Sequence, residues 1–315
     1  MGGRRRALPR YLRPMEGTVP FELEGETART WYAVAGELRP DEPAAPAPLV
    51  ALHGGPGAAH DYLVTLTDLA RDGRAVVLYD QIGNGRSSHF PGRGVDFWTV
   101  DLFVRELQNL VAALGIGDRH HVLGQSWGGF LAQEYALTSP PGLRSLVLAD
   151  TAASFPDFVA EASRLRAELP PEVEATLRRH EQAGTTDDAE YAAACQVFYD
   201  RHVCRLEPWP PELVEAFAWI ERDPTVYHTM NGPSEFHVIG SIKDWQSKDR
   251  LGSIDVPTLV VSRRYDEATP ALQETLVHGI PTCERVLFEE SSHTPHLEER
   301  ERYMQVVGDW LARHD

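Results

Sequence analysis

The stretch GQSWGG, residues 124–129, places Ser126 among small residues. An apolar run, HHVLGQ, ends just before the serine, and a helical pattern, SWGGFLAQEYALTSP, begins with it. A sharp strand-to-helix turn of this kind lifts a serine hydroxyl clear of a sheet, so G-x-S-x-G here predicts a nucleophile. The amide of Trp127, at the start of the helix, is expected to hold a developing oxyanion. The alternative is a structural serine in a glycine-rich turn.

A serine hydroxyl attacks only when a base takes its proton and an acid orients that base. Asp266 follows the apolar run in PTLVVSRRYD, and His293 follows the one in ERVLFEESSH, which is the chain order expected after a nucleophile at this kind of turn. His296 is the nearest rival base, but Pro295 has by then redirected the chain toward the last helix. The alternative for Asp266 is a helix cap. We therefore predict a triad of serine, aspartate and histidine.

Two further loops contain glycine clusters. The loop HGGPG, residues 53–57, follows the apolar run PLVAL, and Gly55 is its best amide donor because Pro56 has no N–H. We expect Gly55 to be the second oxyanion donor, with a plain tight turn as the alternative. The loop DQIGNGRSS, residues 80–88, contains G-x-G without the continuation of a nucleotide loop, so we interpret it as structural support.

Short apolar runs alternate with helical patterns through residues 48–150, which predicts a mostly parallel, doubly wound sheet with helices on both faces. Residues 21–38 are expected to form an antiparallel hairpin, and residues 1–18 a disordered N-terminus. The pattern changes to continuous helices separated by prolines over residues 155–250, and the α/β pattern then returns. We predict an α/β core, residues 19–154 and 251–315, interrupted by a helical cap.

Composition limits the classes of partner. The chain has 315 residues, of which 42% are hydrophobic, so it can bury a sizeable core. A formal net charge of −17 argues against nucleic acid or an anionic membrane as a partner. Three cysteines without metal-ligand spacing, and no long apolar segment, predict a soluble cytoplasmic protein without disulfides or a metal site. No pattern calls for a cofactor.

Five ordered motifs together resemble one family. HGGPG, DQIGNGRSS, GQSWGG, RRYDEATP and SSHTP are similar to those of the proline iminopeptidase family of α/β-hydrolases, over residues 48–300 or so. The cap stretch TMNGPSEFHVIGSIKDW resembles the branch with the tricorn-interacting aminopeptidase and the L-proline amide hydrolases. The resemblance implies an α/β-hydrolase fold whose cap covers the site, and carboxylates that bind the free α-ammonium group of the substrate.

Two glutamates match the motif positions of those carboxylates, Glu235 in NGPSEF and Glu267 directly after Asp266. A carboxylate pair would neutralise an ammonium group in a closed site and reject substrates that lack one. The alternatives are a solvated loop charge for Glu235 and a first-turn acid favouring the helix dipole for Glu267. Cap aromatics such as Trp209, Trp219, Tyr227 and Trp245 are more often core at helical spacing, and we leave them out of the site.

We therefore expect a serine aminopeptidase or amidase that releases an N-terminal residue, proline or another small apolar one, from a peptide or amide with a free amine. An enzyme that removes an aminoacyl group from a natural-product scaffold, and an esterase, lactonase or carbon–carbon bond hydrolase on the same fold, are the enzymatic alternatives. A ligand-binding protein of this fold is the alternative without catalysis.

Overall fold

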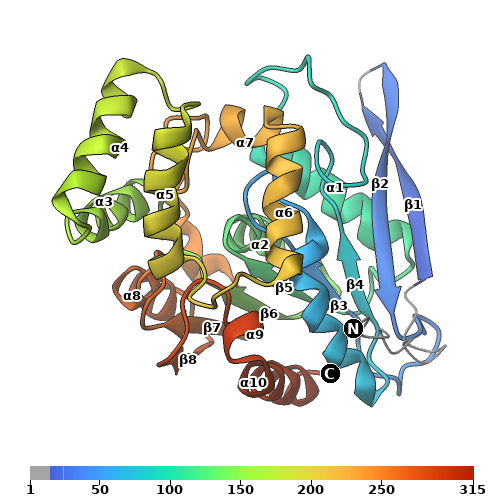
Figure 1. Cartoon of the computed structure of the whole chain (residues 1–315). Coiled ribbons are helices and arrows are strands. Elements are labelled where there is room, and N and C mark those ends of the chain that lie inside the picture. Colours follow the sequence, from blue (N-terminus) through green and yellow to red (C-terminus); the bar gives the residue numbers. More distant parts are fainter. Residues whose placement is uncertain (1–14, 24) are drawn as a thin grey trace, which may run out of the picture.

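The computed structural model describes residues 15–23 and 25–315. An eight-stranded sheet is the centre of the molecule, in the order β1-β2-β4-β3-β5-β6-β7-β8 (Figure 1). The strands β1 and β2 form an antiparallel hairpin whose second strand pairs antiparallel with β4, and the other neighbours are parallel. The strands are β1 (Met15–Leu23), β2 (Glu26–Ala35), β3 (Leu49–Leu52), β4 (Val76–Tyr79), β5 (His120–Gln125), β6 (Leu143–Ala149), β7 (Thr258–Arg263) and β8 (Cys283–Phe288).

Helices cover both faces of the sheet. Alternate residues of each strand point to opposite faces, so one strand contributes side chains to two cores. In β4, Val77 and Tyr79 join the core formed with α1 (Val100–Ala113), α2 (Trp127–Leu137) and α8 (Pro270–Gly279). Val76 and Leu78 instead join the core formed with the 3-10 helix η2 (His60–Asp72) and α10 (Arg300–Arg313). The predicted doubly wound α/β architecture is confirmed.

Five helices lie between β6 and β7 along the chain, and in Figure 1 they stand above the sheet. They are α3 (Phe155–Arg166), α4 (Pro171–Ala183), α5 (Ala189–His202), α6 (Pro211–Arg222) and α7 (Thr225–Met230), followed by the 3-10 turn η3 (Lys248–Ser253). Side chains of α3, α4 and α5 form an apolar cluster of their own, which includes Phe236. We call residues 155–250 the cap, as predicted from the sequence.

Three elements differ from the sequence expectations. Strand β1 begins at Met15, so residues 15–18, expected to be disordered, pair with β2, and residues 1–14 of that expectation lie outside the described part of the chain. The helix expected after HGGPG is a 3-10 helix that ends, as expected, at Gly73 with φ 84°. The last helix is divided into α9 (Pro295–Glu298) and α10, because Glu299 leaves helical geometry with ψ 45°.

None of the helices within residues 15–23 and 25–315 is both long enough and apolar enough to span a membrane.

Candidate active site

Ser126 stands at the turn between β5 and α2, with φ 56° and ψ −124°. A positive φ is unusual for a residue with a side chain and marks the strained turn that presents a nucleophile. Its glycine neighbours allow close backbone packing. A Cβ on Gly124 would lie 2.1 Å from the carbonyl oxygen of Gly128, and one on Gly128 would lie 2.2 Å from that of Leu52. The small residues around the serine are therefore a steric requirement of the turn.

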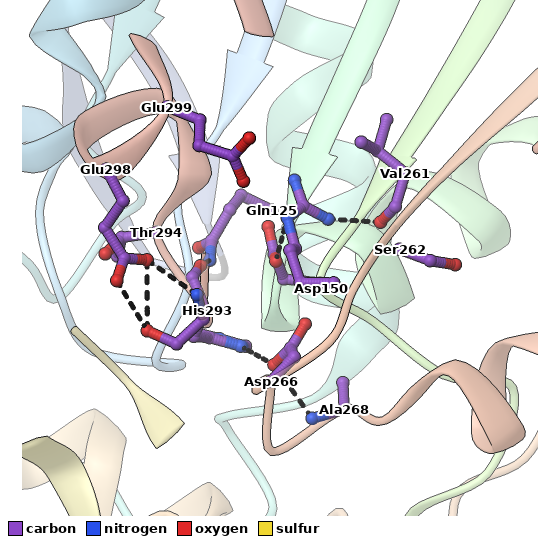
Figure 2. Close-up of polar contacts among 12 residues, drawn as sticks. Gln125, Asp150, Val261, Ser262, Asp266, Ala268, His293, Thr294, Glu298 and Glu299 are labelled. Atoms are coloured by element: carbon purple, nitrogen blue, oxygen red, sulfur yellow. Dashed lines mark hydrogen bonds and ion pairs between the residues drawn. The ribbon is translucent and has the colours of Figure 1, made fainter. Parts of the chain in front are cut away.

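His293 follows β8 and Asp266 follows β7, and the two side chains meet (Figure 2). The His293 Nδ1 to Asp266 Oδ1 distance is 2.6 Å, and the same oxygen accepts a hydrogen bond of 2.9 Å from the amide of Ala268. Burial disfavours the Asp266 carboxylate, but attraction to His293 and to Arg263 outweighs it and holds the pKa of Asp266 below its usual value. An ionised carboxylate here orients the imidazole and leaves Nε2 directed at the cavity.

A second buried acid, which the sequence analysis did not single out, lies beside the first. Asp150 follows β6, is 1% exposed and forms an ion pair of 2.9 Å with the Nε of Arg263. Its carboxylate and the polar atoms of Asp266 and His293 lie within 4.8 Å of one another. Burial, opposed by Arg263, raises the pKa of Asp150 well above its usual value. Asp150 is thus a second buried carboxyl group beside Asp266, and its ion pair with Arg263 offsets part of the cost of burial.

The loop HGGPG packs directly against Ser126, the predicted nucleophile. A Cβ on Gly54 would lie 2.9 Å from the Cβ of Ser126, and Gly55 lines the same cavity as the serine. The amide of Trp127 belongs to the first turn of α2, where N–H groups have no acceptor within the helix. Gly55 and Trp127, the two predicted oxyanion donors, also line the second cavity together with Ser126.

A short hydrogen-bond relay connects these loops. The Gly54 amide donates to the Tyr62 hydroxyl at 2.6 Å, and that hydroxyl donates to the Oε1 of Gln125. The Gln125 amide group in turn donates to the carbonyl of His293 at 3.0 Å. The relay fixes the oxyanion loop, the nucleophile turn and the histidine loop relative to one another.

Two cavities meet at Ser126 and His293. The first is bounded on the core side by Gly54 and Gly55 and on the cap side mainly by apolar side chains of α6, namely Leu213, Ala216, Phe217 and Ile220. The second is lined by aromatic side chains of α2 and α3, namely Trp127, Phe130, Phe155 and Phe158. Both cavities thus bring apolar side chains next to Ser126 and His293.

Both predicted glutamates line the first cavity, and Glu235 lines the second as well. Glu235 is 9% exposed and Glu267 1%. The Tyr227 hydroxyl donates to Glu235 Oε1 at 2.6 Å, and the Glu235 amide donates to the Tyr199 hydroxyl at 3.4 Å. Tyr227 is a site residue that we had excluded, because an aromatic residue at helical spacing in the cap resembles core.

Hydrogen bonds only partly compensate for the burial of the Glu235 and Glu267 carboxyl groups. Burial raises the pKa of Glu235 despite the hydrogen bond from Tyr227. Burial, and then repulsion from Glu235 and Asp266, raises the pKa of Glu267 well above its usual value. Glu267 Oε2 is buried without a hydrogen-bond partner. A pair of this kind is stabilised by a cation placed between its members.

The end of α5 is attached to both loops that carry the histidine and the acid. The amide of His293 donates to the carbonyl of His202 at 3.3 Å, and the hydroxyl of Thr294 donates to that of Val203 at 3.2 Å. The His202 ring contacts the carbonyl of Tyr265 at 3.0 Å. The cap and the predicted triad loops are therefore connected by one backbone–backbone hydrogen bond and two side-chain contacts to carbonyl groups.

Comparison with known proteins identifies the fold and the family. A family model described as alpha/beta hydrolase fold matches residues 47–300. A proline iminopeptidase from Heyndrickxia coagulans is 39% identical over 279 residues, which cover 86% of this chain and 92% of that protein. The chain belongs to the proline iminopeptidase family of α/β-hydrolases. It is a hydrolase, and the resemblance found in the five sequence motifs is confirmed.

Solved structures extend the likeness to the whole fold. A proline iminopeptidase from Mycobacterium smegmatis is 45% identical with a TM-score of 0.86, covering 95% of this chain and 98% of that one. The structure of VinJ is 50% identical with a TM-score of 0.91, covering 96% of this chain and 99% of that one. Both structures therefore match this protein over nearly its whole length.

Proposed function

We propose that this protein is a serine aminopeptidase that releases the N-terminal residue of a peptide or small amide through an acyl-enzyme on Ser126. One observation carries the proposal. Two buried carboxyl groups, Glu235 and Glu267, line the cavity that also contains Ser126 and His293. An esterase or lactonase has no use for paired acids there, whereas an aminopeptidase must hold a free ammonium group close to the scissile carbonyl.

In the proposed mechanism Ser126 attacks the carbonyl carbon of the N-terminal residue while His293 Nε2 takes its proton. Asp266 holds the ring by the contact of 2.6 Å to Nδ1 and stabilises the imidazolium. The amides of Gly55 and Trp127 hold the tetrahedral oxyanion. His293 then gives the proton to the departing amine, and water releases the amino acid.

The free amine sets the substrate class. We propose that Glu235 and Glu267 together hold the α-ammonium group, so that N-acylated substrates leave two buried acids without a partner. Proline and other small apolar residues are the expected N-terminal residues, because apolar side chains line both cavities next to Ser126. The three free cysteines, Cys195, Cys204 and Cys283, support a reducing compartment such as the cytoplasm as the place of action.

The test is the turnover of prolyl and alanyl p-nitroanilides and amides, each with a free or an N-acetylated amine, by wild type and Glu235→Gln. We expect cleavage of the free-amine forms alone, and a fall in kcat/KM of about 10²-fold in the variant, as for a buried charge contact. Glu168→Gln is the matched control, because this carboxylate of the cap is exposed and pairs with Arg164. Equal turnover of free and acetylated forms would refute the proposal.

A further inference from the structure

The loop HGGPG touches a different part of the site at each of its ends. At one end, a Cβ on Gly54 would lie 2.9 Å from the Cβ of Ser126, the predicted nucleophile. At the other end Gly57, with φ 119°, meets helix α7, and a Cβ there would lie 2.8 Å from the Cβ of Tyr227 and 2.9 Å from its backbone nitrogen. Both distances are below 3.0 Å, which real Cβ contacts essentially never show. Only glycine at position 57 therefore allows α7 to lie this close to the loop.

Helix α7 positions Glu235, one of the two proposed amine ligands. The Tyr227 hydroxyl donates to Glu235 Oε1 at 2.6 Å. The amides of Asn231 and Gly232 donate to the Tyr227 carbonyl at 2.8 and 3.1 Å. The side-chain amide of Asn231 donates to the carbonyl of Ser234 at 2.9 Å. A displacement of α7 would therefore carry the segment that contains Glu235 with it.

The loop itself is held to the core. The Gly54 amide donates to the Tyr62 hydroxyl at 2.6 Å. The Gln81 amide donates to His53 Nε2 at 3.0 Å, and the Gln81 side chain donates to the His53 carbonyl at 3.0 Å. The three steps along the chain from Gly54 to Gly57 span at most about 11 Å. A short and firmly bonded segment thus sets how far α7 lies from Ser126.

This distance matters because the N-terminal residue of a peptide has a fixed length. Its amine nitrogen lies about 2.5 Å from its carbonyl carbon, and one extra methylene, as in a β-amino acid, adds about 1.3 Å. If the amine is bound at a fixed place, the carbonyl of a β-aminoacyl group is displaced from the nucleophile by about that amount. A misplacement of about 1 Å can lower the rate about 10²-fold.

We infer that the loop HGGPG is the spacer between the amine site and the reacting carbonyl, and that Gly57 is the positioning residue that restricts the substrate to α-aminoacyl groups. Gly57 acts through Tyr227 and Glu235 and touches no substrate itself. The inference rests on the proposed function, because it takes Glu235 as a ligand of the substrate amine. It adds which class of amine the site accepts and which contact determines that class.

The first test compares alanyl with β-alanyl p-nitroanilide. We expect kcat/KM of the wild type to be about 10²-fold lower on the β-alanyl substrate. Glu235→Asp withdraws the carboxylate by about 1.5 Å without altering the loop. This variant should lose activity on the alanyl substrate and gain about tenfold over the wild type on the β-alanyl substrate, a part of the 10²-fold cost of misplacement. Glu235→Gln is the matched control, because it removes the charge at constant length and should gain nothing.

The second test is Gly57→Ala, whose methyl group would push α7 away from the loop. Carbon atoms in contact prefer a separation of about 3.5–4.0 Å, so the helix must shift by roughly 1 Å. We expect the same change as in Glu235→Asp, a loss on the alanyl substrate and a gain on the β-alanyl one. Gly184→Ala controls for backbone strain, since Gly184 also has a positive φ, 68°, but nothing lies within 4 Å of the added Cβ. It should change neither activity.

A merely structural role of Gly57 would lower both activities together, and a gain on the longer substrate separates the two cases. Labelling of Ser126 with a fluorophosphonate shows whether Gly57→Ala has a folded site, and Glu235→Asp decides if it has not. The inference is overturned if the wild type uses both substrates equally, if Glu235→Asp gains nothing on the β-alanyl substrate, or if a folded Gly57→Ala gains nothing.

Failure of the proposed function has a different signature. Equal turnover of alanyl p-nitroanilide and its N-acetylated form by the wild type would refute the aminopeptidase assignment, and the inference with it. A strict need for the free amine, combined with equal use of the alanyl and β-alanyl substrates, would leave that assignment intact and overturn only the spacer.

Discussion

Tyr227→Phe removes one atom next to the proposed amine site and leaves the packing of the ring in place. The lost hydroxyl is the 2.6 Å donor to Glu235 Oε1, and both side chains are buried. Without this donor Glu235, the carboxylate proposed to hold the substrate amine, is less stable in its ionised form. We expect weaker transition-state binding for every substrate with a free amine.

The magnitude follows from the type of bond. Hydrogen bonds to charged groups contribute about 1.5–3 kcal/mol. At about 1.4 kcal/mol for each factor of ten, kcat/KM for a free-amine anilide should fall about 10- to 150-fold. Hydrolysis of p-nitrophenyl acetate does not use Glu235, so its rate should change less than about twofold, which is the scatter expected of a neutral surface change.

Steady-state kinetics on the two substrates therefore provide the assay, with Tyr199→Phe as the control. Tyr199 also presents a hydroxyl to Glu235, but as an acceptor of the backbone amide at 3.4 Å. Its removal should cost less than about fivefold on the anilide, as for an ordinary neutral hydrogen bond. The reasoning is refuted if Tyr227→Phe lowers both activities equally, or if the two tyrosine variants behave alike.

Three further outcomes are expected. Asp266→Asn should lower kcat about 10⁴-fold with little change in KM, since the amide holds the wrong tautomer of the base; a loss below tenfold would mean that Asp150 can replace it. Glu106 is buried and bonded to the amide of Ile82 at 2.9 Å, and burial raises the pKa of Glu106 to about 8. The folded state therefore holds this proton more tightly than the unfolded chain, and stability should fall as pH rises through 5 to 8, by at most about 5 kcal/mol. Urea unfolding of Glu106→Gln should show a flatter dependence, and an unchanged slope would contradict the assignment. Gly54→Ala should abolish activity on the anilide, because the new methyl group would lie 2.9 Å from the Cβ of Ser126. Full activity would show that the HGGPG loop can move to accommodate the methyl group.

The strands and the order of the predicted triad were readable because their signals are local. Ser126, Asp266 and His293 each follow an apolar run, and turn residues surround them. Their assembly at one edge follows from the parallel sheet, whose strands end on the same side. The hairpin β1–β2 was also recognisable, although its first strand begins earlier, at Met15, where polar and apolar residues alternate weakly.

Other parts of the site depend on long-range pairing that no local pattern contains. Asp150 follows β6 just as Asp266 follows β7, and this parallel was a signal available in the sequence. Its meaning depends on the pairing of Ala149 with Val261, which brings the two strand ends together. Tyr227 was excluded for a related reason, since only the folded cap shows that its hydroxyl points at Glu235 and not into the apolar cluster.

The attachment of α5 to the histidine and acid loops limits how the cap can move. A hinge motion that lifted the end of α5 would pull on the backbone of His293, through its bond to the carbonyl of His202, and on Tyr265, through the His202 ring. Opening by that route would take the base out of alignment in every catalytic cycle. Helix α6, whose side chains wall the first cavity, is attached to a different part of the core, because the Trp219 indole donates to Asp61 of η2 at 3.1 Å. The cap is thus held to the core through both α5 and α6, and only the α5 attachment acts directly on the loops of the predicted triad.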